Sequence, residues 1–182
     1  MLFKKTPING LFLVDLERRT DERGFFARYF CELEFSNQGL NTQWVQINNS
    51  LSSEVGTLRG LHFQSPPHSE VKLVRCLRGA IWDVVVDLRD GSETFGKWFG
   101  TTLSDENRTM MYVPMGFAHG FITLERDSEV LYLVSDFYTP ESEGTLIWND
   151  PDVGIQWPIK PKVLSDKDSL GELLKDISPV RI

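Results

Sequence analysis

The chain consists largely of short strand-like runs that end at glycine or proline, and helical periodicity is almost absent from it. The stretch IWDVVVDLR, residues 81–89, alternates as a strand should and is rich in valine. Glycines and prolines between the runs are typical of turns. The expected strands cover residues 11–15, 25–30, 43–50, 57–63, 72–77, 80–88, 98–103, 109–113, 120–124 and 129–137. Many short strands at regular spacing predict a sandwich or a barrel.

The helical and domain signals are few. Only residues 166–176, DKDSLGELLKD, and more weakly residues 33–38 have helical character. No internal repeat, low-complexity tract or linker divides the 182 residues, a length that can bury a full hydrophobic core. The sequence therefore predicts one all-β domain over residues 1–182, with a short helical segment near its C-terminal end.

Charge and composition exclude several classes of function. The formal net charge is −7, which argues against a general binder of nucleic acid or of membrane surfaces. The apolar stretch near the start is soon interrupted by Asp15 and Glu17, which argues against a signal peptide. No run approaches the roughly 20 apolar residues of a membrane span. Cys31 and Cys76 lie in apolar runs and are expected to be buried free thiols. We expect a cytoplasmic protein.

The chain has three histidines, and one of them lies in an unusual setting. In GTLRGLHFQSPPHSEVKLVR, residues 56–75, His62 has several cations around it, and Glu70 is the only carboxylate. Neighbouring cations disfavour the protonated imidazole. The residues alone leave three readings of His62 open: a neutral base, a metal ligand or a buried structural histidine. His68, in the SPPHSE stretch, is expected at the surface.

The segments that end at two of the histidines resemble the two halves of the cupin signature. This resemblance implies a double-stranded β-helix, or jelly roll. Gly56 and His62 carry the first half, and PMGFAH, ending at His119, carries the second. Metal-binding cupins continue with a second histidine two residues on, but Gln64 stands there in this chain. Since such a metal site needs about three or four good ligands, we predict that no metal is bound.

A more specific resemblance covers nearly the whole chain. It is carried, in order, by DERGFF (21–26), VQINNS (45–50), LRGLHFQ (58–64), KLVRCLRG (72–79), DVVVDLR (83–89), TFGKW (94–98), VPMGFAHGF (113–121), WNDP (148–151) and LSDKD (164–168). In these motifs the chain resembles the dTDP-4-dehydrorhamnose 3,5-epimerases. The resemblance implies a cofactor-free homodimer with exchanged N-terminal strands, acting on nucleotide-linked 4-keto-6-deoxy sugars.

The resemblance also implies catalytic roles for four residues. His62 would be the base that removes a proton next to the ketone, and Asp168 would orient it. Tyr132 would be the acid on the opposite face, and Lys72 the cation near the C4 oxygen. Besides the structural reading of His62, the other three have plainer alternatives: Asp168 as a helix-cap residue, Tyr132 as a core tyrosine and Lys72 as a solvated strand residue.

Further residues are candidates for holding the substrate. By the same resemblance, Arg59 and Arg23 would bind the phosphates. Phe26, Gln46 and Tyr138 would bind the nucleoside and its diphosphate, although Phe26 has a core alternative. His119 and Asp83 complete the expected substrate site, either in contact with the sugar or as supporting structure.

Two departures from the family pattern affect substrate recognition. Arg28 stands where members commonly have a glutamate at the base-binding end, and Ile47 replaces an aspartate. Thymine and uracil offer an N3–H donor, whereas cytosine offers an acceptor that suits an arginine. A CDP-linked substrate and inversion at only C3 or C5 therefore stay open. A metal-dependent cupin and a noncatalytic sugar-nucleotide-binding protein are the alternatives of other classes.

Overall fold

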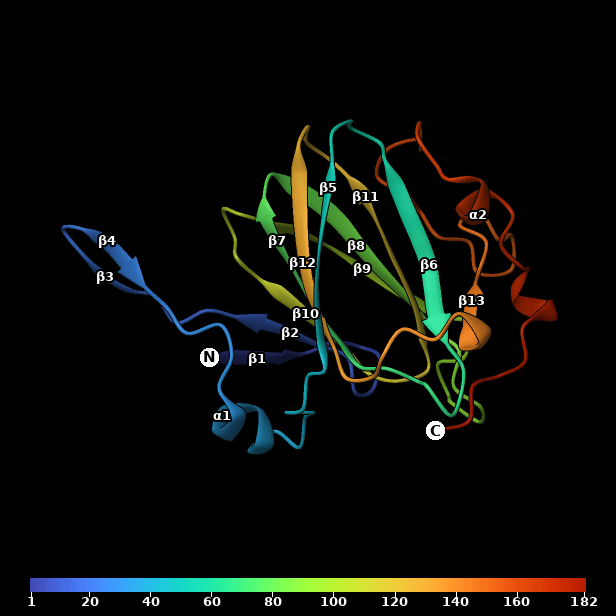
Figure 1. The fold of residues 1–182 in the computed structure, drawn as a ribbon, viewed down its shortest axis with the longest axis horizontal. Coiled ribbons are helices and arrows are strands. Elements are labelled where there is room, and N and C mark those ends of the chain that lie inside the picture. Colours follow the sequence, from blue (N-terminus) through green and yellow to red (C-terminus); the bar gives the residue numbers. More distant parts are fainter.

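The computed structural model describes residues 1–182 as two facing antiparallel sheets and one separate hairpin (Figure 1). The first sheet has the order β1 (Leu2–Lys5), β2 (Phe12–Asp15), β10 (Met110–Val113), β7 (Lys72–Arg78), β12 (Ser128–Val134) and β5 (Gln46–Ser52). The second has the order β13 (Glu143–Thr145), β6 (Leu58–Gln64), β11 (Phe117–Thr123), β8 (Ala80–Asp87) and β9 (Trp98–Ser104). This arrangement confirms the predicted jelly roll.

The main core lies between the two sheets. Side chains at alternate positions of a strand face the same side, so Val74 and Cys76 of β7 point inward together. They pack in one cluster with Ile81 and Val85 of β8 from the facing sheet. Along β5 and β6 many of the inward-facing side chains are polar, and a cleft replaces the core there.

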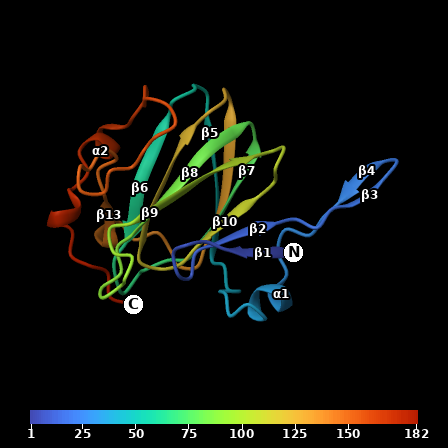
Figure 2. The ribbon, with the colours of Figure 1, turned by 180° about the vertical axis from the view of Figure 1, so that it is seen from behind.

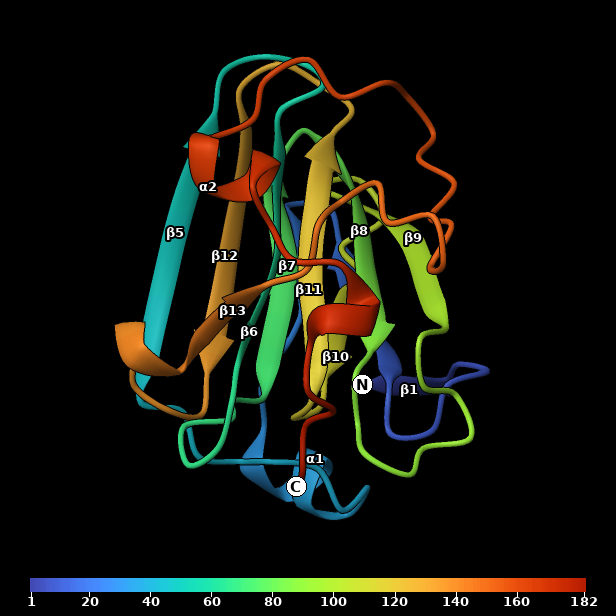
Figure 3. The ribbon, with the colours of Figure 1, turned by 90° about the vertical axis from the view of Figure 1, so that its right-hand side faces the viewer.

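Short helices and loops cover the outer faces of both sheets. Phe35 of α1 (Glu32–Ser36) is fully buried against the outer face of the first sheet. The C-terminal segment, with α2 (Asp166–Ser169) and the turns η1 (Pro140–Ser142) and η2 (Leu174–Asp176), crosses the outside of the second sheet (Figure 3). The ring of Trp157 from this segment packs 5.4 Å from that of Trp82 on β8. None of the helices is long and apolar enough to cross a bilayer.

The hairpin of β3 (Arg19–Asp21) and β4 (Gly24–Phe26) projects away from the sandwich (Figures 1 and 2). Phe26 is 65% exposed there, which is unusual for a large aromatic side chain in a single chain. Phe25 has the guanidinium of Arg108 over its ring, 4.7 Å from the ring centre. The hairpin therefore displays an aromatic side chain that this chain does not cover.

A β-bulge in β6 shapes the site. His119 pairs with His62, but Phe121, two residues on, pairs with Arg59, three residues back. The extra residue brings Arg59 and His62 to the same side of the strand, although residues three apart normally face opposite sides. A Cβ at Gly60 would lie 2.6 Å from the His119 carbonyl oxygen, and its φ of +113° also favours glycine.

Several predicted elements are corrected by the structure. The strand expected over 25–30 is limited to β4, because the chain leaves the hairpin after Phe26. The helix expected over 166–176 breaks after Ser169, since Glu172 hydrogen-bonds with the backbone of Thr145 and Ile147 instead. The sequence did not predict β1, β3 or β13. Cys31 is only partly buried, whereas Cys76 is buried as expected.

Within one chain, the first two strands pair with the sandwich and the next two do not. β1 pairs with β2, and β2 pairs with β10 of the same chain. The β3–β4 hairpin forms a two-stranded sheet of its own.

Candidate active site

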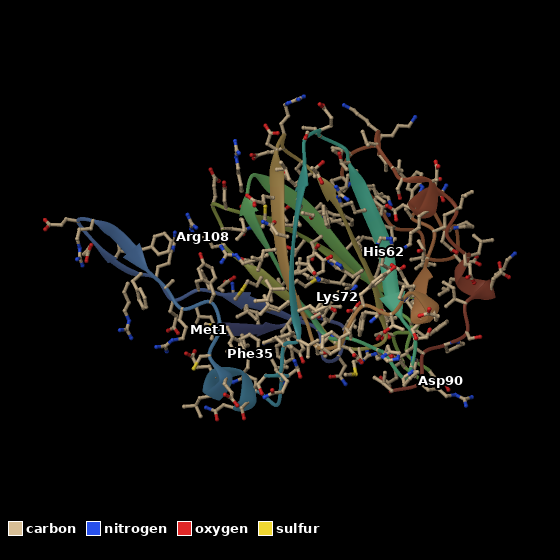
Figure 4. All side chains as sticks on the ribbon, viewed as in Figure 1. Met1, Phe35, His62, Lys72, Asp90 and Arg108 are labelled. Carbon is tan, nitrogen blue, oxygen red and sulfur yellow. The ribbon has the colours of Figure 1, made fainter.

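A polar cleft opens between the inner faces of β5 and β6. A cavity of about 470 Å³ holds Ser50, Arg59 and Asp168 among its lining residues. A second space of about 300 Å³ holds Gln46 and Tyr138. The two share His62, Lys72 and Tyr132, so they form one cleft with these three side chains at its middle. Figure 4 shows His62 and Lys72 within the sandwich.

His62 is joined to Asp168 by a short hydrogen bond. Nε2 of His62 lies 2.6 Å from Oδ1 of Asp168, although 106 residues separate them in the chain. The imidazole is 31% exposed and the carboxylate only 6%. Because an ionised carboxylate can only accept, Nε2 carries the proton and Nδ1 keeps a free lone pair. The pair therefore has the geometry of an imidazole base whose ring is oriented by a carboxylate.

The C-terminal segment brings Asp168 to the cleft. The Val163 carbonyl accepts a hydrogen bond of 2.9 Å from the Leu58 amide, which ties the segment to β6. The Ser165 hydroxyl caps α2 by accepting from the Asp168 amide at 3.1 Å. Burial alone would raise the pKa of Asp168, but its hydrogen bonds with His62, Ser165 and the Gly60 backbone outweigh it and lower that pKa. Asp168 therefore stays ionised, as an orienting carboxylate must.

Tyr132 faces the cleft from the other sheet. Its strand β12 pairs with β5 and β7, whereas His62 lies on β6 of the facing sheet. Burial raises the pKa of Tyr132 first, and the charge of Glu70 raises it further, while Arg59 has the opposite effect. The phenol therefore keeps its proton at neutral pH and can donate it.

Lys72 is buried, so the alternative that it is a solvated strand residue is wrong. It is 8% exposed, and its Nζ lies 3.0 Å from Oε1 of Glu70. Its side chain lines both halves of the cleft. A buried ammonium beside the base is suited to stabilising negative charge that forms during a reaction.

His119 and Asp83 form a second histidine–carboxylate pair behind the first. His119 is the direct cross-strand neighbour of His62, and its Nε2 lies 2.8 Å from Oδ1 of Asp83. Asp83 is fully buried, and its Oδ2 has no hydrogen-bond partner. His119 lines the cavity but Asp83 does not, so the structure places Asp83 as support and His119 at the wall.

Arg59 differs from the other cations of the cleft because no carboxylate pairs with it. Its Nε donates to the Ser52 hydroxyl at 3.0 Å, and one terminal nitrogen donates to the Leu51 carbonyl at 3.3 Å. Both partners are neutral groups of β5. The guanidinium is therefore fixed in place while its charge remains available to an anionic ligand.

The far end of the cleft carries an exposed aromatic ring. Tyr138 is 57% exposed, and its amide donates to Oε1 of Gln46 at 2.7 Å. Its hydroxyl donates to Glu143 at 2.8 Å, and Glu143 also pairs with Lys167 at 2.5 Å. Sequence reasoning missed Glu143 and Lys167, because β13 is only three residues long and gave no strand signal.

Gln64 holds two loops together at this end. Its amide nitrogen donates to the carbonyls of His68 and Phe137, and its oxygen accepts from the Thr139 amide. No group of three or more His, Cys, Asp or Glu side chains is placed to hold a metal ion. The residue at the cupin ligand position therefore has a structural role here. His68 lies at the surface as expected, with its side chain 40% exposed.

Three predicted substrate residues lie outside the cleft of this chain. Arg23 and Phe26 are on the β3–β4 hairpin, and Arg28 follows it. Arg23 pairs with Asp21 at 2.5 Å, and Arg28 pairs with Glu34 at 3.2 Å. The other nine predicted residues are at the cleft or directly behind it: His62, Tyr132, Asp168, Lys72, Arg59, Gln46, His119, Tyr138 and Asp83.

Comparisons with known proteins agree with this arrangement. The family model described as dTDP-4-dehydrorhamnose 3,5-epimerase matches residues 5–176. The enzyme of that name from Methanothermobacter thermautotrophicus is 46% identical over 169 residues, which are 91% of this chain and 90% of that protein. The crystal structure of the enzyme of that name from Elizabethkingia anophelis NUHP1 has a TM-score of 0.94 at 45% identity, covering 97% of both chains.

A second solved structure contains a nucleotide sugar. It is dTDP-6-deoxy-D-glucose-3,5-epimerase from Legionella pneumophila Philadelphia 1, in complex with dTDP-4-keto-L-rhamnose. Its TM-score is 0.91 at 40% identity, and the match covers 97% of this chain and 94% of that chain.

Proposed function

Because this chain belongs to the dTDP-4-dehydrorhamnose 3,5-epimerase family, we propose that it inverts C3 and C5 of a dTDP-linked 4-keto-6-deoxy sugar. The observation that carries the proposal is the His62–Asp168 pair in a cleft whose opposite wall presents Tyr132. A base and an acid that face each other across one cavity are what an inversion by proton transfer requires. The chain is an isomerase.

The first step is removal of a proton from the carbon next to the ketone. Nδ1 of His62 takes the proton, the C–H electrons form a C=C bond, and the negative charge moves to the C4 oxygen. Asp168 stabilises the imidazolium that results, and Lys72 donates to the enolate oxygen. Each of the two groups acts on charge that exists only after proton transfer begins, which is how a site lowers the barrier.

The second step returns a proton from the opposite side. Tyr132 gives its hydroxyl proton to the same carbon, the ketone re-forms, and the carbon is inverted. His62 then loses its extra proton and Tyr132 regains one, both by exchange with water. Since C3 and C5 both flank the C4 ketone, the same residues serve both inversions when the sugar ring turns in the cleft.

The nucleotide is held by the outer parts of the cleft. Arg59 binds the diphosphate, and the exposed ring of Tyr138, with Gln46 beside it, packs against the base. The relative whose structure contains dTDP-4-keto-L-rhamnose supports a dTDP-linked substrate. Arg28, which could donate to N3 of cytosine, makes a CDP-linked sugar the comparison to include in the assay.

The test is an assay in heavy water with dTDP-4-keto-6-deoxyglucose and its CDP counterpart side by side. We expect deuterium at both C3 and C5 of the dTDP-linked sugar, together with inversion at both centres. Deuterium at one centre only would assign a single inversion. Absence of exchange with either nucleotide, from a folded protein, would refute the epimerase proposal.

We also propose a homodimer in which the β3–β4 hairpin reaches the cleft of the partner. The proposal is supported by Phe26, which is exposed, and by Arg23, whose type suits a phosphate and which lies between β3 and β4 on the hairpin that projects away from the sandwich. In sedimentation velocity at micromolar concentration we expect a dimer. A stable monomer would contradict this proposal.

Mixing two inactive variants tests the reach of the hairpin. One chain carries Arg23→Ala and the other His62→Ala. In a mixed dimer, the first chain keeps its own His62 and receives Arg23 from the second, so one complete cleft re-forms. Recovery of activity on mixing, up to about a quarter of wild type for random pairing, supports the shared cleft. If activity does not recover although mixed dimers form, the hairpin serves only its own chain.

A further inference from the structure

The buried ion pair of Glu70 and Lys72 is only half explained by the proposed function, which uses Lys72 alone. The pair is 3.0 Å apart, with side chains 12% and 10% exposed. Glu70 lines the same part of the cleft as Tyr132. Taking a carboxylate out of water has a free-energy cost, so its presence in the cleft calls for a compensating role.

The backbone fixes Glu70 firmly. The amide of the next residue, Val71, donates to the Ser135 hydroxyl at 2.8 Å, and the Ser135 amide donates back to the Val71 carbonyl at 3.1 Å. On the other side, Gln64 donates to the His68 carbonyl at 2.9 Å. Glu70 is therefore held between two anchored points, directly before β7 begins at Lys72.

This arrangement restricts where the Lys72 ammonium can lie. A lysine side chain has four rotatable bonds, and holding its end group in one place has an entropic cost. Residues two apart on an extended segment face the same side, so Glu70 can hold Lys72 from its own wall of the cleft. The ammonium has three donors. One is used by Glu70, and the others remain for the substrate.

Glu70 also contributes to the charge around Tyr132. The charged groups that act on this phenol are Glu70, Arg59 and Glu143, and His62 and Lys72 line the same space. Glu143 is paired with Lys167. After burial, the charge of Glu70 is the largest influence, and it raises the pKa of Tyr132. Loss of this charge would let the phenol lose its proton at a lower pH.

We propose that Glu70 is a positioning residue of the epimerase, which holds the Lys72 ammonium beside the forming enolate and sets a fixed negative charge next to Tyr132. The inference rests on the proposed function. It assigns Glu70 two separable effects, one through the hydrogen bond to Lys72 and one through charge.

Two substitutions separate these effects. Glu70→Gln keeps an acceptor for Lys72 but removes the charge, so kcat at the pH optimum should stay within about threefold of wild type. The alkaline limb of its kcat–pH profile should move to lower pH, because the charge that helps to keep the Tyr132 phenol protonated is gone. Glu70→Leu removes acceptor and charge, so the limb should move equally, and kcat should also fall about tenfold, with a smaller change in KM. Glu106→Gln, an exposed change outside the cleft, should alter neither.

The measurement is the pH dependence of kcat and of deuterium exchange for each variant, with circular dichroism to confirm folding. An alkaline limb that stays in place in Glu70→Gln overturns the charge effect, and this arm holds even if Glu70→Leu does not fold. A folded Glu70→Leu with wild-type kcat overturns the positioning of Lys72. Failure of the proposed function is distinct, because the wild-type protein would then show no exchange at all.

Discussion

Replacing Asp168 by Asn tests the central pair with little change in shape. The asparagine side chain has the same size and can still reach Nε2 of His62, which lies 2.6 Å from Oδ1 of Asp168. Two properties are lost. The imidazolium formed during proton transfer has no counter-charge. The amide can also donate to Nε2, which would move the ring proton to Nδ1 and remove the lone pair that acts as base.

The size of the effect follows from the charges. Two unit charges about 4 Å apart interact by about 4 kcal/mol at an effective dielectric constant of about 20. That constant suits a pair whose carboxylate is nearly buried and whose imidazole is partly exposed. Since each 1.36 kcal/mol is tenfold in rate, kcat should fall by about a thousandfold. The wrong tautomer would add to this loss.

The assay is the rate of deuterium incorporation at C3 of the sugar, measured in single turnover so that substrate binding and product release do not contribute. Asp166→Asn is the matched control, because Asp166 lies on the same short helix but is exposed. The control should exchange at the wild-type rate. If folded Asp168→Asn exchanges within about threefold of wild type, the carboxylate is only a helix-end residue and the reasoning is wrong.

Three further predictions concern other parts of the molecule. Tyr132→Phe should reduce net inversion far more than deuterium exchange, since His62 can still remove and return a proton on one face; equal retention of both rates would remove Tyr132 from the mechanism. Asp87→Asn should cost about 3–5 kcal/mol of unfolding free energy at neutral pH, because the fully buried carboxylate pairs with Arg89 at 2.7 Å. Burial would raise the pKa of Asp87, but its hydrogen bonds with Arg89 and its neighbours lower it, so this difference should shrink in chemical denaturation below about pH 4. Incubation with EDTA followed by desalting should leave epimerisation unchanged; a loss that one divalent ion restores would make His62 a ligand.

The sandwich could be predicted from sequence because its strands carry their signal locally. β8 alternates and is rich in valine, and the strands next to it end at glycines that turn the chain. The elements that were missed or wrongly predicted depend on contacts with residues far away in the sequence. β13 has three residues and forms only because β6 offers it a partner, which is a tertiary effect. The helical pattern of 166–176 is overridden at Glu172 by hydrogen bonds with distant backbone.

The candidate catalytic residues were proposed through a resemblance, and the structure adds their geometry. Nothing in the local sequence brings Asp168 next to His62; the contact depends on the path of the C-terminal segment across β6. Glu70 shows the reverse case. In the sequence, Glu70 is the only acidic residue near His62. In the structure its carboxylate pairs with Lys72, two residues further along the chain, and not with His62.

In a chain of net charge −7, the positive charge available to an anionic nucleotide depends on how the cations of the cleft are paired. Three cations line the cleft, and two of them are neutralised: Lys72 by Glu70 and Lys167 by Glu143. Arg59 alone keeps its charge free, while a nucleotide diphosphate carries at least two negative charges. One chain therefore supplies too little positive charge for the ligand that the family binds. Arg23, on a hairpin that points away from the cleft, is paired with Asp21 in the same way, so at the cleft of a second chain it would add hydrogen-bond donors rather than an unpaired charge.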